Sequence, residues 1–285
     1  MTAGERRLLI QRVAFSMLGL ATAMTVLPII LIVGVIAWKG APALEWSFLF
    51  DAPRDGLRAG GIWPALVGTI YLTIGTGLIA VPVGLAAAIY LSEYARETFF
   101  TRAIRIAIIN LAGIPSVVYG LFGLALFVLF LGLGTSIVAA SLTLSIMTLP
   151  VIISTAEEAL RAVPQSFRLV SQGMGGTKWQ TIRRIVLPQA LPGILTGVIL
   201  GLERAAGETA PILFTGAALF LPQLPASIFD ETMALPYHLF VISTQVPGMP
   251  VKVQFGTALV LLVFVLSMNV LATFIRSTYR RRRQW

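Results

Sequence analysis

Six long apolar segments, separated by connections that hold most of the charged and turn-forming residues, dominate the pattern of this chain. Each is close to, or longer than, the roughly 20 residues that an α-helix needs to cross the hydrocarbon core of a bilayer. We therefore expect an all-α polytopic membrane protein with six transmembrane helices. The expected helices cover residues 13–37, 65–91, 103–131, 135–155, 191–213 and 257–274.

Basic residues concentrate on alternate connections between these segments. One side has Arg6, Arg7, Arg12, Arg96, Arg102, Arg105, Arg161, Arg168, Lys178, Arg183, Arg184, Arg276 and Arg280 to Arg283. The other side has only Lys39, Arg54, Arg58 and Lys252. The positive-inside rule then places both termini and the connection between the fourth and fifth helices in the cytoplasm. The net charge of +9 is explained as an orientation signal, so we expect no nucleic-acid partner.

Composition supports the membrane class. The chain is 57% hydrophobic and 12% charged, with a mean hydropathy of +0.88, far from the values of a soluble domain. It has no cysteine, which excludes a disulfide framework and a thiolate metal site. Basic residues before the first segment and Ala41-Pro42-Ala43 after it imitate a signal peptide. The apolar run exceeds the usual 7–15 residues of a signal peptide, so we expect a retained helix.

The longest outer connection, residues 215–255, is expected to fold back on itself. Its prolines, which favour turns and at most short helices, are Pro222, Pro225, Pro236, Pro247 and Pro250. Asp230, Glu231 and the lone His238 are expected to be solvated loop residues. A single histidine without cysteine partners indicates a structural residue more than a metal ligand.

The connection between the fourth and fifth segments contains signals for two short helices. Pro164 suits a helix first turn, and Gly175 and Gly176 suit a helix stop. Residues 177–180 match a capping box, and Pro188 is expected to end the second helix. Each helix has one apolar face, made of Phe167, Val170 and Met174 in the first and Ile182, Ile185 and Val186 in the second. Such a hairpin could lie on lipid headgroups or dock a soluble partner.

Three ionisable residues, Glu203, Arg204 and Glu208, interrupt the fifth segment. A charge at the bilayer centre costs from about 2.5 to more than 10 kcal/mol, so these groups need partners, water or a function. Small residues recur every fourth position, at Gly193, Gly197, Gly201, Ala205 and Thr209, which favours a close helix approach. At about 100° per residue, Arg204 and Glu208 fall within this stripe and can pair, whereas Glu203 lies on its flank. The pair should face the bundle or a partner subunit.

The hairpin resembles a known family element. Gly175 is followed, after nine residues, by Ile185-Val186-Leu187-Pro188. This spacing is similar to the G-x9-I-x-L-P pattern in the cytoplasmic loop of type I ABC importer permeases. In that family the loop forms a coupling helix seated in a cleft of the ATP-binding subunit. The resemblance therefore implies a coupling loop that includes Gly175, Gly176, Ile185, Leu187 and Pro188. The family's Glu-Ala-Ala triplet falls here on Leu169-Val170-Ser171.

Other segments resemble the two permeases of the high-affinity phosphate (Pst) importers. These are residues 111–120, 149–152, 155–160 and 207–211, and the likeness extends over about 62–276. Glu208-Thr209-Ala210-Pro211 and Ala234-Leu235-Pro236-Tyr237 are more similar to the A-type permease than to its C-type partner. Glu203 departs from the pattern, because an uncharged small residue usually precedes the arginine.

The resemblance implies an organisation and a set of partners. It predicts an N-terminal tail, first helix and outer loop at 1–61, a permease domain of five helices at 62–276 with its coupling loop at 156–190, and a basic tail at 277–285. The implied partners are a homologous C-type permease, two ATP-binding subunits, an extracytoplasmic phosphate-binding protein, phosphate and membrane lipid. ATP and magnesium would bind the partner ATPase, with no cofactor on this chain. The implied location is the bacterial cell (inner) membrane.

For a transported oxyanion, Arg204 offers a planar fork of donors. Glu208 would hold Arg204 in place and weaken its binding of the anion, because a site in a transport pathway must also release its ligand. Glu203 joins this predicted pathway without a defined role. The alternative is that Arg204 and Glu208 form a structural ion pair that fixes helix register.

Other functions remain open at this point. Sulfate or molybdate could replace phosphate, because one arginine does not identify an oxyanion. An ion-coupled secondary transporter should repeat its charged, broken helix in both halves of the chain, and only one charged cluster is present. A membrane enzyme should cluster histidine and carboxylates near a membrane surface. The chain also lacks the G-x4-G-K-[ST] motif, as expected if a partner hydrolyses ATP.

Overall fold

Long helices account for most of the molecule. The computed structural model describes residues 3–281; residues 1–2 and 282–285, the ends of the two predicted tails, lie outside the described residues. Within it, five helical segments are long and apolar enough to cross a membrane, and a bent helix pair makes a sixth. The five are Gln11–Ala43, Trp63–Tyr94, Ile137–Arg161, Lys178–Gly207 and Val251–Phe274. The expectation of an all-α protein with several membrane spans is confirmed.

The elements follow one another in a simple order. The first half contains α1 (Ala3–Gly40), η1 (Ala41–Ala43), α2 (Trp46–Phe50), β1 (Pro53–Arg54), β2 (Ala59–Gly60), α3 (Trp63–Ile89), η2 (Tyr90–Tyr94), α4 (Phe99–Ala112), α5 (Ser116–Gly123) and η3 (Leu124–Phe130). The second half contains α6 (Ile137–Arg161), α7 (Gln165–Gly173), α8 (Lys178–Thr181), η4 (Ile182–Val186), α9 (Leu187–Gly207), α10 (Ala210–Thr215), α11 (Leu235–Thr244) and α12 (Val251–Arg281).

The third expected span, residues 103–131, is not one straight helix. Its two parts, Phe99–Ala112 and Ser116–Phe130, meet at an angle of 102°. Pro115 has no N–H to donate, and its ring disfavours helical backbone at Ile114, so the helix breaks there. The Tyr119 hydroxyl donates to the Leu111 carbonyl at 2.7 Å and so satisfies a backbone acceptor at the end of α4. The span expected at residues 103–131 is therefore a bent pair of helices.

The packed centre of the bundle is α6, which lies against both α3 and α9. Small residues allow the close approach: a Cβ atom at Gly84 would lie 2.7 Å from Cγ2 of Ile152. Most polar side chains in this interface are paired, although Oγ of Ser141 in α6 has no hydrogen-bond partner among the described residues. Thr69 and Thr76 of α3 donate their hydroxyls to carbonyls one turn earlier, at 2.8 and 2.7 Å. Such internal pairing is needed wherever water is absent.

The first helix, α1, contacts α12 and leaves most of its surface open. The two meet closely at Gly40, where a Cβ atom would lie 2.5 Å from the Phe255 carbonyl oxygen. Apolar side chains along α1 are exposed, for example Phe15 at 65% and Leu18 at 63%. Hydrocarbon is as apolar as these side chains, so this exposure fits a helix surrounded by lipid.

The connections at one end of the bundle form a small folded layer. β1 and β2 pair antiparallel, with Pro53 opposite Gly60 and Arg54 opposite Ala59. α11 is the short helix expected within residues 215–255, and the backbone N–H of Leu235 donates to Oγ1 of Thr69 at 2.8 Å. This bond fastens α11 to the start of α3. The outer connection is therefore packed onto the bundle.

His238, expected to be a solvated loop residue, is instead buried in α11 with 4% of its surface exposed. Burial lowers the pKa of His238 from 6.5 to about 4, so the imidazole is neutral at pH 7. The expected loop role fits Asp230, whose carboxylate accepts from the backbone N–H groups of Ala226 and Ser227 at 2.9 and 2.8 Å. Packing of the outer layer explains why the histidine is not solvated.

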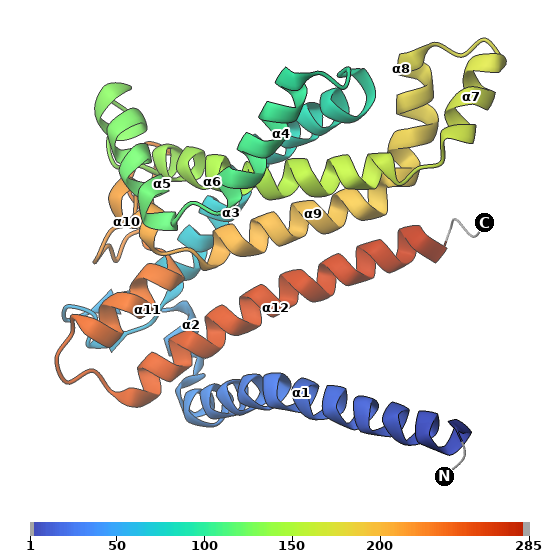
Figure 1. Cartoon of the computed structure of the whole chain (residues 1–285). Helices are drawn as coiled ribbons and strands as arrows, with labels where there is room; N and C mark the ends of the chain where they lie inside the picture. The colour runs from blue at the N-terminus through green and yellow to red at the C-terminus, as the bar shows by residue number, and fades with distance from the viewer. Residues whose placement is uncertain (1–2, 282–285) are drawn as a thin grey trace.

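The molecule has two distinct ends. Both described chain ends and the α7–α8 hairpin lie at one end, on the right in Figure 1, and α2 and α11 lie at the other. The basic connections therefore share one side, as the alternating charge pattern requires. The assignment of that side to the cytoplasm remains a prediction from the charges.

Candidate functional site

The α7–α8 hairpin turns at the two glycines identified in the sequence. Gly175 has a φ of +84°, a left-handed conformation that glycine adopts without strain. The backbone N–H of Gly176 donates to the Ser171 carbonyl at 3.0 Å, which closes the end of α7. The predicted capping box is present, with Gln180 N–H donating to Thr177 Oγ1 at 3.2 Å and Thr177 N–H donating to Gln180 Oε1 at 2.9 Å. The helix–turn–helix prediction is confirmed.

The second helix of the hairpin does not end at Pro188, contrary to expectation. Helical backbone runs from Lys178 through Gly207 and includes Ile185, Leu187 and Pro188. The π-helical turn η4 shifts the hydrogen-bond register just before the proline, which cannot donate. The hairpin is thus a direct extension of a membrane span, so a movement of α8 must also move α9.

A groove lies between the two arms of the hairpin. It is lined by Ser166, Phe167, Val170, Ser171, Met174, Gly176, Gln180, Arg184 and Ile185. The exposed side chains include Val170 at 62% and Met174 at 85%, which is unusual for apolar residues next to water. Residues 159–202 contain no acidic side chain. The hairpin therefore offers an apolar surface with a basic rim.

The charged interruption of the fifth segment lies at a true helix break. α9 ends at Gly207, and Glu208 has an extended backbone, with φ −79° and ψ 136°, before α10 begins. Arg204 Nε nevertheless donates to Glu208 Oε1 at 3.3 Å, so the predicted pair is present. The two side chains are 34% and 18% exposed on this chain. Glu208 is therefore held at the end of the helix and not on its face.

The small-residue stripe of α9 packs on α6, and this explains its spacing. Cβ atoms built at Gly193 and Gly201 would lie 2.6 Å from Ala159 Cβ and 3.0 Å from Ile152 Cγ1. Gly197 lies against Thr155, closer than any side chain would allow. The expected close helix approach is confirmed. Thr209 lies beyond the helix, so the stripe ends at Ala205.

Glu203 points to a different neighbour. Its carboxylate lies near the side chain of Asn269 in α12, which acts on it electrostatically. The Oε1 atom is buried and has no hydrogen-bond partner among the described residues. The residues next to Glu203 in the sequence do not explain this third charge and do not identify Asn269 as its neighbour. The signal was present, because an asparagine within an apolar span needs a polar partner.

Tyr119 belongs beside Arg204, although sequence reasoning did not single it out. The Tyr119 side chain is 5% exposed, and the charge of Arg204 acts on its phenol. The next residue, Gly120, allows α5 to cross α10, since a Cβ atom there would lie 2.9 Å from the Ala210 carbonyl oxygen. The break at residues 113–115 and the break at 208–209 therefore lie close together. Residues 111–120 and 207–211 each carry a motif, but neither pattern indicates that the two segments are in contact.

The site contains no evident metal centre. Across residues 3–281, no group of three or more histidine, aspartate or glutamate side chains is arranged to hold a metal ion. Its chemistry is that of one arginine, two carboxylates and nearby hydroxyl groups at a break in the helices.

Comparisons with known proteins give a consistent assignment. The model of the family described as binding-protein-dependent transport system inner membrane component matches residues 80–284. The probable ABC transporter permease protein YqgI of Bacillus subtilis (strain 168) is 31% identical over 283 residues, which cover 94% of this chain and 96% of the relative. Phosphate transport system permease protein PstA 1 of Mycobacterium tuberculosis (strain ATCC 25618 / H37Rv) is 33% identical over 289 residues, covering 98% and 91%.

Solved structures support the fold. A chain of the MetNI methionine ABC transporter, in an inward-facing conformation, aligns with a TM-score of 0.61 at 19% identity, covering 77% of this chain and 94% of that one. A chain of a bacterial ABC transporter that imports the acidic polysaccharide alginate aligns with a TM-score of 0.65 at 15% identity, covering 94% and 99%. The expected fold of a type I ABC importer permease is confirmed.

Proposed function

The chain belongs to the family of binding-protein-dependent transport system inner membrane components, and we propose that it is the permease subunit of an ATP-driven importer of inorganic phosphate. The observation that carries the substrate assignment is its likeness to phosphate permeases over nearly the whole chain, with 33% identity across 98% of its length. The Arg204–Glu208 pair supplies chemistry that suits this substrate.

Arg204 is proposed to contact phosphate in transit. A guanidinium can bind two oxygens of a phosphate at once and keeps its charge at any physiological pH. Its position at a helix break, with 34% of the side chain exposed, leaves it accessible to an anion. A dianion entering a low-dielectric passage needs fixed positive charge, but several unpaired arginines would trap it. One arginine paired with Glu208 is a compromise between capture and release.

Energy is proposed to enter from outside the chain. ATP and magnesium would bind two partner ATP-binding subunits, and this chain would carry no cofactor. The apolar, basic-rimmed hairpin, with Gly175 and Gly176 at its turn, supports docking to such a subunit. A homologous C-type permease would complete the passage, and an extracytoplasmic binding protein would deliver phosphate. The proposed location is the bacterial inner membrane, with both termini in the cytoplasm.

The substitution Arg204→Ala tests the proposed role. In a reconstituted complex we expect ATP-dependent phosphate uptake to be abolished while the other subunits still copurify. Arg54→Ala is the matched control, because Arg54 is also paired with a carboxylate but is 70% exposed in the outer layer. Uptake at the wild-type rate by Arg204→Ala would show that the arginine does not serve the anion.

A further inference from the structure

Arg168 joins the first arm of the hairpin to the ends of the membrane helices by hydrogen bonds. It lies within α7, but only 13% of its side chain is exposed, and it bonds inward. Its Nη2 and Nε atoms donate to Oε1 and Oε2 of Glu93 at 2.7 and 3.2 Å. Its Nη1 and Nη2 atoms also donate to the carbonyls of Val163 and Leu160 at 2.7 and 2.9 Å. The guanidinium is thus held on both edges.

These bonds join elements that the chain connects poorly. Glu93 lies in η2 at the end of α3, with 7% of its side chain exposed, and Leu160 lies in the last turn of α6. α7 follows α6 after residues 162–164 alone, and its N-cap is Pro164. Because Pro164 has no N–H, the helical series of backbone hydrogen bonds does not continue from α6 into α7, and this short connection can act as a hinge. No covalent connection joins α7 to α3 nearby, so the ion pair supplies the link.

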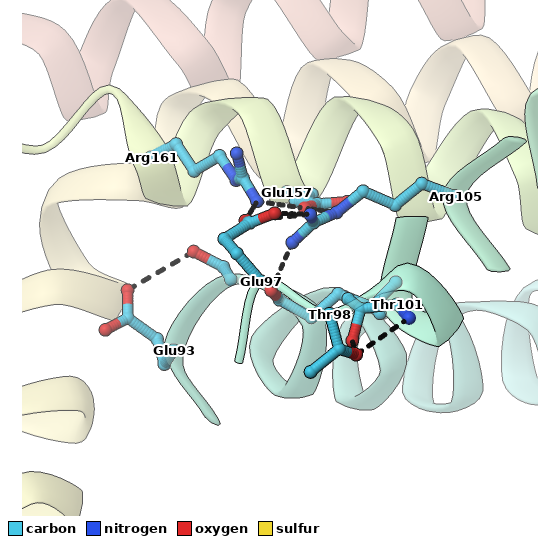
Figure 2. A network of polar contacts seen from close by, with 9 residues as sticks. Glu93, Glu97, Thr98, Thr101, Arg105, Glu157 and Arg161 are labelled. Atoms are coloured by element: carbon cyan, nitrogen blue, oxygen red, sulfur yellow. Dashed lines mark hydrogen bonds and ion pairs between the residues drawn. The ribbon is translucent and has the colours of Figure 1, made fainter. Parts of the chain in front are cut away.

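A second group of charges joins the same helix ends to each other (Figure 2). Arg105 of α4 donates to Glu157 of α6 at 2.8 Å, to Glu97 at 2.9 Å and to the Leu91 carbonyl in η2 at 2.9 Å. Arg161 lies 3.2 Å from Glu97 and 3.0 Å from Glu157. The ends of α3, α4 and α6 therefore form one connected block. Glu93 lies beside this block in Figure 2, and its ion pair with Arg168 attaches the hairpin there.

The hairpin has few other polar attachments. Among the residues that the structure describes, Arg168–Glu93 is the one ion pair that joins residues 165–181 to the rest of the chain. Lys178 lies 4.8 Å above the Tyr94 ring, and Phe167 packs on the apolar cluster below. The Ser171 and Thr181 hydroxyls, 2.8 Å apart, bond within the hairpin itself.

We propose that the Arg168–Glu93 ion pair is the rigid link that passes a displacement of the hairpin to α3 and α6. This proposal rests on the proposed function as an ATP-driven permease. Arg168 is then a positioning residue: it touches neither nucleotide nor substrate, and it prevents α7 from rocking about the 162–164 hinge. Only arginine has enough N–H donors to make two hydrogen bonds to the Glu93 carboxylate and two more to backbone carbonyls.

The test uses two conservative variants in the complete complex. Glu93→Gln removes the charge of the acceptor, and Arg168→Lys keeps the charge but cannot make the four bonds. Glu97→Gln is the matched control, since Glu97 is a nearby paired carboxylate whose side chain is 65% exposed. Spin labels at Leu78→Cys and Val270→Cys, 72% and 69% exposed in α3 and α12, report helix movement in this cysteine-free chain.

We expect both variants to keep the ATP-binding subunits and to hydrolyse ATP. In both variants the distance between the spin labels should no longer change with ATP, and the ratio of phosphate transported to ATP hydrolysed should fall at least tenfold. Glu97→Gln should retain the distance change and the wild-type ratio. A preserved distance change would overturn the proposal, and so would loss of the ATP-binding subunits, which would make the pair a docking element. If the wild-type complex moves no phosphate, the proposed function fails, but the distance change still tests the link.

Discussion

Removing the charge of Glu208 should make the proposed anion site bind more tightly and turn over more slowly. A phosphate dianion about 4 Å from Arg204 would gain about 8 kcal/mol at an effective dielectric constant of about 20. Glu208 lies 3.3 Å beyond the guanidinium. At about 7 Å from the dianion it would take back about 5 kcal/mol, which leaves roughly 3 kcal/mol of net attraction. Glu208→Gln abolishes the opposing contribution.

Water reduces this effect, because the two side chains are 34% and 18% exposed. If about a third of the repulsion between Glu208 and the dianion remains after screening, its removal is worth about 1.5 kcal/mol, or about a tenfold increase in the affinity for phosphate. Glu208→Gln should therefore lower the KM for phosphate about tenfold and lower kcat by a similar factor, since release becomes slow. Uptake of radiolabelled phosphate by proteoliposomes measures both constants. An unchanged or higher KM in Glu208→Gln would show that Glu208 does not oppose anion binding at Arg204.

The exposed carboxylate of Glu158 provides the control for that experiment. Glu158→Gln makes the same chemical change at the end of α6, outside the helix break. Its KM and kcat should match those of the wild type. A decrease in KM with this variant too would point to a general charge effect.

Three further outcomes follow from the geometry. Glu203→Gln should lower the KM for phosphate by about threefold or less, because Glu203 lies near Asn269, and the ion pair of Arg204 is with Glu208; an effect equal to that of Glu208→Gln would contradict this placement. Gly193→Ala would place a Cβ atom 2.6 Å from Ala159 Cβ, so the free energy of unfolding should fall by about 1–3 kcal/mol. Thermal unfolding measures this change, and an unchanged Tm would argue against the tight α6–α9 contact. His238 has a pKa of about 4 in the folded protein against an ordinary 6.5. Its contribution to the free energy of unfolding, about 3 kcal/mol, is therefore complete above pH 6.5 and is lost as the pH falls towards 4. His238→Gln should flatten that part of the stability profile measured by thermal unfolding, and an equally steep fall would exclude the histidine as its cause.

Features that depend on neighbours along the chain were accessible from sequence. The Thr177–Gln180 capping box, the left-handed Gly175 and the Arg204–Glu208 pair involve residues three or four positions apart or a single backbone angle. The α9 stripe was predicted for the same reason, because helical periodicity brings Gly193, Gly197 and Gly201 to one face.

Features that depend on the rest of the fold were not accessible. Pro115 is a local signal for a helix break, but the 102° angle also depends on the crossing of α5 and α10 at Gly120. Pro188 is a local stop signal that a π-helical turn overrides. Arg168 and Glu93 are 75 residues apart, so no periodicity connects them. His238 looked like a loop residue because its burial comes from the packing of α11 on the bundle.

The central claim is that this permease moves phosphate. Its most direct test is ATP-dependent uptake of radiolabelled phosphate by the complete complex in proteoliposomes, with unlabelled sulfate as the competitor. We expect uptake that requires ATP and the partner subunits, and a hundredfold excess of sulfate should not reduce it. Uptake suppressed by sulfate, or absent while labelled sulfate or molybdate accumulates, would contradict it and assign the chain to another oxyanion.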